Sequence, residues 1–215
     1  LIGAALVALP GGHYLAVTLG TFLVSGLFPC EAENWPQWRG PNHNGVSTAT
    51  GLPTTWNQSE NVVWSKKLPS WSGGSPVVWG DRIFLTSPNS GEEIQGGEKL
   101  LLGCLSTKDG EVLWQRTLDE GNAYFRKHNN TTPSPVTDGE RVFAITGTGV
   151  VRAFDMEGTA LWQYDLQDQY GDFGLMWGYA SSPLLHDGAL YVEVLHGMHT
   201  DEPSYLIAFD AAKGA

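Results

Sequence analysis

The sequence has few charged residues and lacks a basic segment. Lysine, arginine, aspartate and glutamate make up 16% of its 215 residues, and 23 acidic residues against 12 basic ones give a formal net charge of -11. Such a chain repels phosphate backbones, and no run of lysine or arginine is long enough to form a basic stripe. Nucleic acid is therefore not an expected partner.

Cysteine is also scarce, and the motifs of several large enzyme classes are missing. Cys30 and Cys104 are the two cysteines, and they lie in such different kinds of segment that we expect no disulfide between them. Cys104 is expected to be a small buried apolar residue. The sequence contains no P-loop, no Gly-x-Ser-x-Gly elbow and no dinucleotide fingerprint, so nucleotide and acyl-transfer chemistry lack support.

The N-terminal region has no Lys, Arg, Asp or Glu before Glu31. Residues 15–28 form an apolar run of signal-peptide length, and cleavage near Ala32 is favoured over lipidation of the nearby cysteine. The alternative is a retained membrane anchor, although residues 10–12 interrupt the apolar run. We predict that residues 1–32 are a signal peptide or N-terminal membrane segment. The protein is then periplasmic or secreted in a bacterium and contacts a membrane only through this segment.

Tryptophan and glycine are abundant. The chain contains nine Trp and 27 Gly, and 41% of its residues are hydrophobic. This balance favours many short strands joined by tight turns over helices that face solvent, and it provides enough apolar residues for a core. The composition predicts an all-β fold.

One pattern is repeated three times along the chain. Each copy opens with Ser-Pro before an apolar strand, then has a turn with glycine, a second strand with an aliphatic residue before an aromatic one, and a third apolar strand. The copies open at Ser75-Pro76, Ser134-Pro135 and Ser182-Pro183, and the turns lie at 80–81, 138–140 and 187–188. A fourth strand follows another turn glycine and carries Trp114 or Trp162.

Repeats of this size with four strands each match the blades of a β-propeller, because a lone four-stranded sheet cannot bury both faces and must stack on its neighbours. The predicted blades are residues 75–118, 134–166 and, incompletely, 182–215. Trp64, with Leu68 after it, repeats the pattern of the last strand with no hairpin ahead. We therefore expect residues 61–68 to be a ring-closing outer strand.

Residues 106–114 and 154–162 resemble the tryptophan-docking motif of pyrroloquinoline-quinone (PQQ) type propeller repeats, and residues 209–214 resemble its beginning. The opening 35–45 is similar to that of secreted bacterial PQQ-binding-like propellers. Ser106 departs from the pattern because it replaces the usual Asp, and the turn before Gly158 is one residue shorter. The resemblance implies the N-terminal portion of a propeller, residues 33–215, with four-stranded antiparallel blades in a ring of about seven or eight.

The resemblance leaves function open, because this scaffold hosts quinoprotein dehydrogenases, an outer-membrane assembly lipoprotein and proteins of other roles. A dehydrogenase would hold PQQ with calcium, and many members add a pair of adjacent cysteines, which this sequence lacks. We favour a binding or scaffold module for a protein partner or small ligand on the channel face, with catalysis not demonstrated. The alternative is a PQQ-dependent alcohol or sugar dehydrogenase, and a carbohydrate-binding propeller is a third.

The candidate ligand-binding residues lie just before the inner strands, where the loops converge on one end of the channel. They are Trp71, His128, Trp177 and Tyr179, which offer stacking surfaces and hydrogen-bond donors. The competing interpretation is aromatic packing at the rim. Two imidazoles and two carboxylates in 196–202 are potential zinc ligands, but a polar loop between strands explains them equally well, so we assign no metal site.

Overall fold

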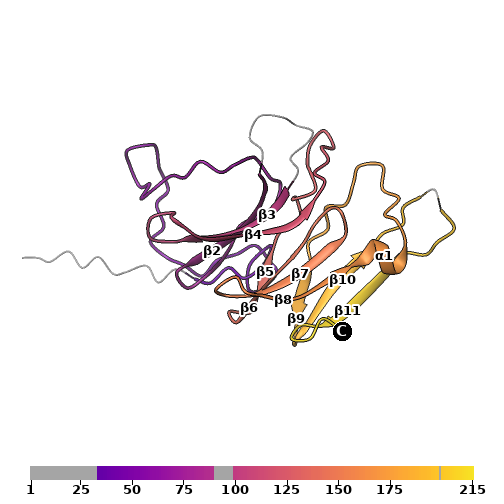
Figure 1. The fold of residues 1–215 in the computed structure, drawn as a ribbon. Coiled ribbons are helices and arrows are strands. Elements are labelled where there is room, and N and C mark those ends of the chain that lie inside the picture. The colour runs from indigo at the N-terminus through magenta and orange to yellow at the C-terminus, as the bar shows by residue number, and fades with distance from the viewer. Residues whose placement is uncertain (1–32, 90–98, 199) are drawn as a thin grey trace, which may run out of the picture. The chain divides into compact units, whose positions relative to one another are not determined.

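The three repeats fold as three antiparallel sheets that follow one another along the chain (Figure 1). The first has the order β1 (Val77–Trp79), β2 (Arg82–Pro88), β3 (Lys99–Ser106) and β4 (Val112–Glu120). The second consists of β5 (Val136–Thr137), β6 (Arg141–Ile145), β7 (Val150–Asp155) and β8 (Ala160–Asp165), and the third of β9 (Leu184–His186), β10 (Ala189–Val194) and β11 (Tyr205–Asp210). We call these sheets blades 1, 2 and 3. They confirm the prediction of an all-β fold with propeller blades.

The computed structural model describes residues 33–89, 99–198 and 200–215, which belong to the unit Glu31–Ala215. The predicted signal or membrane segment, residues 1–32, lies outside the described residues. Within the described part of the chain, none of the helices has the length and apolar character needed to cross a membrane.

The predicted hairpin turns are present in all three blades. In blade 3, β9 and β10 are joined by Asp187 and Gly188, whose φ values of 47° and 75° are both left-handed. A two-residue turn of this kind matches the twist of the flanking strands. One difference is at the end of blade 2, where Leu166 begins the short helix α1 (Leu166–Tyr170) and does not continue the strand. Asp165 causes this by accepting hydrogen bonds from the N–H groups of Gln167 and Asp168.

Alternation along the strands builds a core on each side of blade 2. Val142 and Ala144 of β6 pack against blade 1, together with Phe84 and Leu102, whereas the intervening Phe143 packs toward blade 3. The blade 3 side of this second core includes Leu190, Val192, Val194 and Phe209. Successive residues of a strand point to opposite faces of its sheet, and here both faces are apolar. A blade that packs between two neighbouring blades requires this pattern.

Blades 1 and 2 each dock a tryptophan on a turn glycine of the next blade. The ring of Trp114 lies against Gly158 so closely that a Cβ at this glycine would come within 2.7 Å of it, and Trp162 lies in the same way against Gly214. The indole Nε1 atoms donate to the carbonyl oxygens of Met156, at 2.9 Å, and Ala211, at 3.0 Å. The motif therefore stabilises the interface between neighbouring blades.

Trp64 makes the same contact with blade 1. Its ring lies against Gly110, and its Nε1 donates to the carbonyl of Thr107 at 2.8 Å. In the two other copies the docking tryptophan belongs to the outer strand of a four-stranded blade. Residues 61–68 form no strand in the structure, so their role as a ring-closing strand remains a prediction, which this contact supports.

The opening segment lies along the free edge of the inner strands. Trp35 exchanges two backbone hydrogen bonds with Val78 of β1, at 2.8 and 2.9 Å, and the N–H of Thr137 in β5 donates to the carbonyl of Pro36 at 2.9 Å. The segment thus pairs backbone N–H and C=O groups of the edge strands β1 and β5, which would otherwise lack partners. The candidate residues lie in the loops that precede these inner strands.

Candidate functional site

Three loops lead into the inner strands, and we call them the lead-in loops: residues 70–76, 121–135 and 171–183. They contact one another directly. The hydroxyl of Ser72 donates to the carbonyl of Thr131 at 2.7 Å, and the amide of Asn129 donates to the carbonyl of Trp71 at 3.0 Å. Buried Thr86 of β2 donates to the same Thr131 carbonyl at 2.7 Å. These bonds between blades hold the loops in fixed relative positions.

The four candidate residues do not form one site. His128 and Trp177 line one pocket together, whereas Trp71 packs edge-on against Tyr124 with ring centroids 5.4 Å apart. Tyr179 lies in the core between blades 2 and 3 at 1% exposure, stacked on Phe173, and its hydroxyl donates to the carbonyl of Glu193 at 3.0 Å. Burial raises the pKa of Tyr179, and the nearby Glu193 carboxylate adds to this. Its ring is therefore not exposed to a ligand.

A tight turn builds the pocket shared by His128 and Trp177. The N–H of Phe125 donates to the carbonyl of His128 at 2.8 Å, and the two rings stack with centroids 5.3 Å apart. This turn leaves Arg126 and Lys127 exposed at its tip, with Arg126 at a φ of 59°. Gly178 packs under the Phe125 ring, where a Cβ would come within 2.4 Å. That close approach fixes Trp177 beside the turn.

The resulting pocket has a volume of about 280 Å³ and is lined by Phe125, Arg126, Lys127, His128 and Trp177. It combines aromatic surface with two cationic side chains. The Nδ1 atom of His128 is buried and has no hydrogen-bond partner among the residues that the structure describes. A buried polar atom without a partner is unfavourable unless a ligand or water satisfies it.

A second pocket, of about 220 Å³, shares Trp177 with the first and is also lined by Leu175, Met176, Met198 and three glycines. The exposed fractions of Met176, Trp177 and Met198 are 64%, 62% and 81%. Adjoining exposed apolar side chains of this size are typical of interaction sites, and methionine adapts its shape to a partner. We define the recognition surface as Phe125, Arg126, Lys127, His128, Leu175, Met176, Trp177 and Met198.

A third pocket, of about 460 Å³, shares Gly174 with the second and has an acidic character from Asp172 and Glu202. His196 lies at its wall but is buried. Its Nδ1 lies 2.8 Å from the carbonyl oxygen of Pro203 and its Nε2 lies 2.7 Å from that of Tyr170. Both ring nitrogens are thus engaged with the backbone, which removes His196 as a metal ligand. His199 lies outside the described residues.

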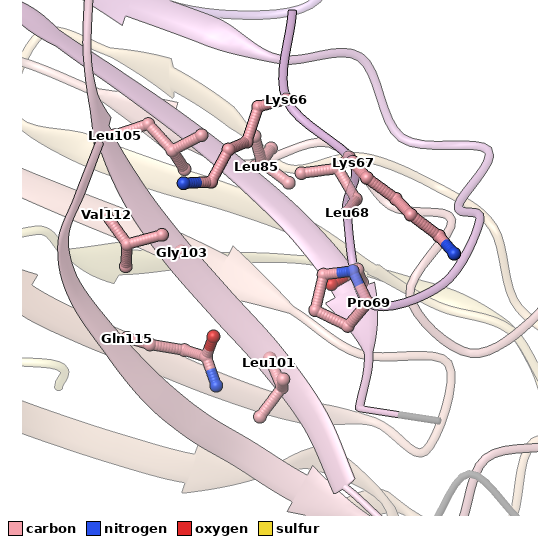
Figure 2. Close-up of a pocket in the computed structure, with 11 residues that line it drawn as sticks. Lys66, Lys67, Leu68, Pro69, Leu85, Leu101, Gly103, Leu105, Val112 and Gln115 are labelled. Carbon is pink, nitrogen blue, oxygen red and sulfur yellow. The ribbon is translucent and has the colours of Figure 1, made fainter. Parts of the chain in front are cut away.

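A further groove, of about 340 Å³, is part of the blade architecture (Figure 2). It lies between residues 66–69 and the face of blade 1 that carries Leu85, Leu101 and Leu105, while Lys67 extends away from that face. Lys66 is held by Glu111, with Nζ 3.5 Å from Oε1. The groove is lined by the segment that follows the docked Trp64 and by strands of blade 1, so we interpret it as structural.

The chain matches the family model described as "Outer membrane protein assembly factor BamB" over residues 45–215. The chain belongs to this family. The resemblance to PQQ-type propeller repeats is therefore confirmed. No curated protein matches.

Solved structures similar to this BamB-family chain include BamB from Moraxella catarrhalis, with 21% identity and a TM-score of 0.44 over 71% of this chain and 38% of that one. A europium-containing methanol dehydrogenase has 17% identity and a TM-score of 0.47, over 72% and 29%. A quinohemoprotein alcohol dehydrogenase from Comamonas testosteroni has 15% identity and a TM-score of 0.43, over 66% and 19%. The chain thus spans well under half the length of these proteins.

PQQ with calcium, the cofactor pair that the resemblance to PQQ-type repeats implies, needs a stacking slot beside a set of oxygen ligands. Of the four aromatic candidates, Tyr179 is buried, and Trp71 is 43% exposed beside Tyr124 but does not line the pocket that His128 and Trp177 share. Across residues 33–89, 99–198 and 200–215, no three His, Cys, Asp or Glu residues are grouped to hold a metal ion. The described residues thus show no carboxylate, histidine or cysteine ligand set for the ion.

Sequence reasoning singled out two residues of the recognition surface, His128 and Trp177. Arg126, Lys127 and Met176 belong to the same predicted loops but were not chosen as candidates, and Phe125, Leu175 and Met198 were missed. Part of the signal was available, since Arg126-Lys127 and Met176 immediately precede the two candidates. Met198 follows β10, and nothing in its sequence position indicates that it lies beside Trp177.

Proposed function

We propose that this protein is an exported member of the BamB family that binds a partner protein through the recognition surface. The observation that supports this proposal most strongly is the gathering of Met176, Trp177 and Met198, all more than half exposed, beside two exposed cations on rigid loops. Partly exposed aromatic anchors next to arginine are the residue types that carry binding energy at protein interfaces. Hydrogen bonds join the first two lead-in loops, and Gly178 packs under Phe125 beside Trp177, so little ordering of Trp177 and the two cations is needed on binding.

Export is part of the same proposal. The family description names an outer membrane assembly factor, and the uncharged N-terminal region has the composition of a secretion signal. We infer that the folded protein acts in the periplasm or outside the cell. The partner would then be a protein of the cell envelope or the medium.

Two experiments test the proposed function. Titration of the purified protein with PQQ and calcium, followed by absorbance, and dye-linked oxidation of alcohols and sugars are expected to give neither stoichiometric binding nor turnover. Turnover would establish the dehydrogenase alternative instead. In the second experiment a photoreactive amino acid replaces Met176 in the producing bacterium, and it is expected to give one discrete protein adduct.

A further inference from the structure

The three pockets along the lead-in loops form a series that changes in character from one end to the other. The first and second share Trp177, and the second and third share Gly174. The series begins with Arg126 and Lys127, continues with Met176 and Met198, and ends with Asp172 and Glu202. A ligand that follows this series meets positive charge, then apolar surface, then negative charge.

The two cations are available for a ligand. Within the described ranges, neither Arg126 nor Lys127 has a carboxylate within ion-pair distance, whereas Arg82 pairs with Glu157 at 2.9 Å and Arg141 with Asp138 at 2.8 Å. Arginine presents a planar fork that binds a carboxylate through two hydrogen bonds, and lysine adds a point charge. Exposed unpaired cations in a chain of net charge -11 are complementary to a carboxylate placed directly against them.

The chain's overall negative charge limits but does not prevent this contact. Repulsion between separated exposed charges is screened beyond about 8 Å at physiological ionic strength. A carboxylate within hydrogen-bond distance of Arg126 therefore interacts mainly with that residue and its neighbour. The net charge acts on the rate of approach more than on the bound contact.

The middle of the series fits one apolar side chain. The volume of about 220 Å³ beside Trp177 is below the range of most sites for small molecules and sufficient for one leucine-sized or phenylalanine-sized group. The exposed Trp177 ring offers a flat contact for it, and Met176 and Met198 adjust around it. His128, stacked on Phe125, adds an aromatic wall to the first pocket.

We propose that the recognition surface binds an acidic peptide segment of its partner, with carboxylates on Arg126 and Lys127 and one apolar anchor between Trp177 and the two methionines. The segment carries no carboxylate beyond its anchor, because Asp172 and Glu202 lie there. This inference rests on the proposed function and adds the chemical class of the ligand.

Isothermal titration calorimetry with unlabelled synthetic peptides tests this inference on the purified protein. The first probe has the sequence Asp-Glu-Asp-Gly-Leu-Phe-Gly-Ser, acetylated at its N-terminus and amidated at its C-terminus so that no carboxylate lies beyond the anchor. The second probe has the same blocked ends and replaces the acids by Asn-Gln-Asn. The acidic peptide is expected to bind about tenfold more tightly than the amide peptide at low salt, with the difference shrinking as salt is added. Equal affinities, or no binding of either peptide at millimolar concentration, would overturn the proposal.

Matched variants locate the binding. The double variant R126Q/K127Q is expected to reduce affinity for the acidic peptide to that of the amide peptide without changing the latter, and W177A is expected to weaken both. The controls K67Q/K108Q and W56A remove two exposed cations and one exposed tryptophan elsewhere and are expected to have no effect. If the control variants lose as much peptide affinity as R126Q/K127Q and W177A do, the assignment of binding to the recognition surface is contradicted.

The two proposals fail in different ways. A photoreactive residue at Met176 detects any protein partner, whatever its charge. A discrete adduct there, together with no preference for the acidic peptide, would overturn only the ligand class. If there is neither an adduct at Met176 nor a preference for the acidic peptide, the proposed function is overturned as well.

Discussion

The backbone N–H of Ser134 donates to the hydroxyl of Ser182 at 2.9 Å, and the N–H of Ser75 donates to the hydroxyl of Ser134 at the same distance. Each serine of the repeated Ser-Pro pair thus binds the equivalent serine of the next blade. The repeat therefore specifies a contact between blades as well as the start of a strand. This serine chain lies at the base of the lead-in loops and fixes the spacing between them.

Removing one hydroxyl of the serine chain is expected to destabilise the protein. In S182A the N–H of Ser134, which is 3% exposed, loses its acceptor, and an unsatisfied buried N–H costs about 1–3 kcal/mol. Urea unfolding measures this loss. The control S181A removes the neighbouring hydroxyl, which contacts the exposed Glu193, and it is expected to leave stability nearly unchanged. Equal effects of the two variants would show that the serine chain contributes nothing specific.

The tryptophan docking predicts that Gly158 tolerates no side chain. Gly188 and Gly158 both have left-handed φ values, 75° and 80°, but a Cβ at Gly188 meets open space whereas one at Gly158 meets the Trp114 ring. We expect G188A to cost about 1–2 kcal/mol from backbone strain, and G158A to cost about 1–3 kcal/mol more from steric conflict. The free energies of unfolding of the two variants provide the comparison. Similar values would mean that the indole moves away without cost.

Cys104 is expected to be unreactive in the folded protein. Burial raises the pKa of its thiol to about 12, and the carboxylates of Asp81 and Glu157 add to this while Arg82 opposes it. The thiolate needed for alkylation is therefore almost absent at pH 8. Iodoacetamide labelling in a C30S background, followed by mass spectrometry, should give slow modification until denaturant is added. Rapid labelling of native protein would contradict the buried position.

The turn residue Asp155 predicts a loss of stability in acid. Burial opposes its ionisation, but the N–H groups of Thr159, Glu157 and Gly158 and the Thr159 hydroxyl together hold its pKa below the ordinary value. A depressed folded pKa stabilises the protein above the unfolded pKa of about 3.9, and this contribution is lost as pH falls through the folded value.

The variant D155N isolates this effect because it keeps an oxygen acceptor and removes the titration. The stability difference between the native protein and D155N is expected to be constant at neutral pH and to shrink below about pH 4. Denaturant unfolding across this range measures the difference. A constant difference down to pH 2 or below would contradict the assignment of the low pKa to Asp155.

The repeated parts of the fold were predictable from sequence, and the parts that occur once were not. Ser75, Ser134 and Ser182 share a register, so three copies reveal one structural role. In blade 2, Asp155 alone accepts hydrogen bonds from the N–H groups of Glu157 and Thr159. In blade 1 two residues share this task, because the Ser106 hydroxyl accepts from the N–H of Lys108 and Asp109 accepts from the N–H of Glu111. The departure from Asp at Ser106 is therefore tolerated. These local bonds follow from short sequence separations.

The candidate site was only partly predictable because it depends on loops of unequal length. Tyr179 lies near the start of an inner strand, as expected, but its ring turns into the core between blades 2 and 3. Met198 reaches Trp177 from a different loop, and the pairing of Trp35 with Val78 joins segments more than forty residues apart. Such contacts depend on tertiary packing, and no periodic pattern encodes them.

Photocrosslinking tests the central claim of partner binding most directly. A photoreactive amino acid is placed at Met176 and, in a second strain, at Val63, which is 90% exposed and lies outside the recognition surface. The account predicts a discrete protein adduct from position 176 that disappears when W177A is added, and none from position 63. No adduct from position 176, or the same adduct from both positions, would contradict it.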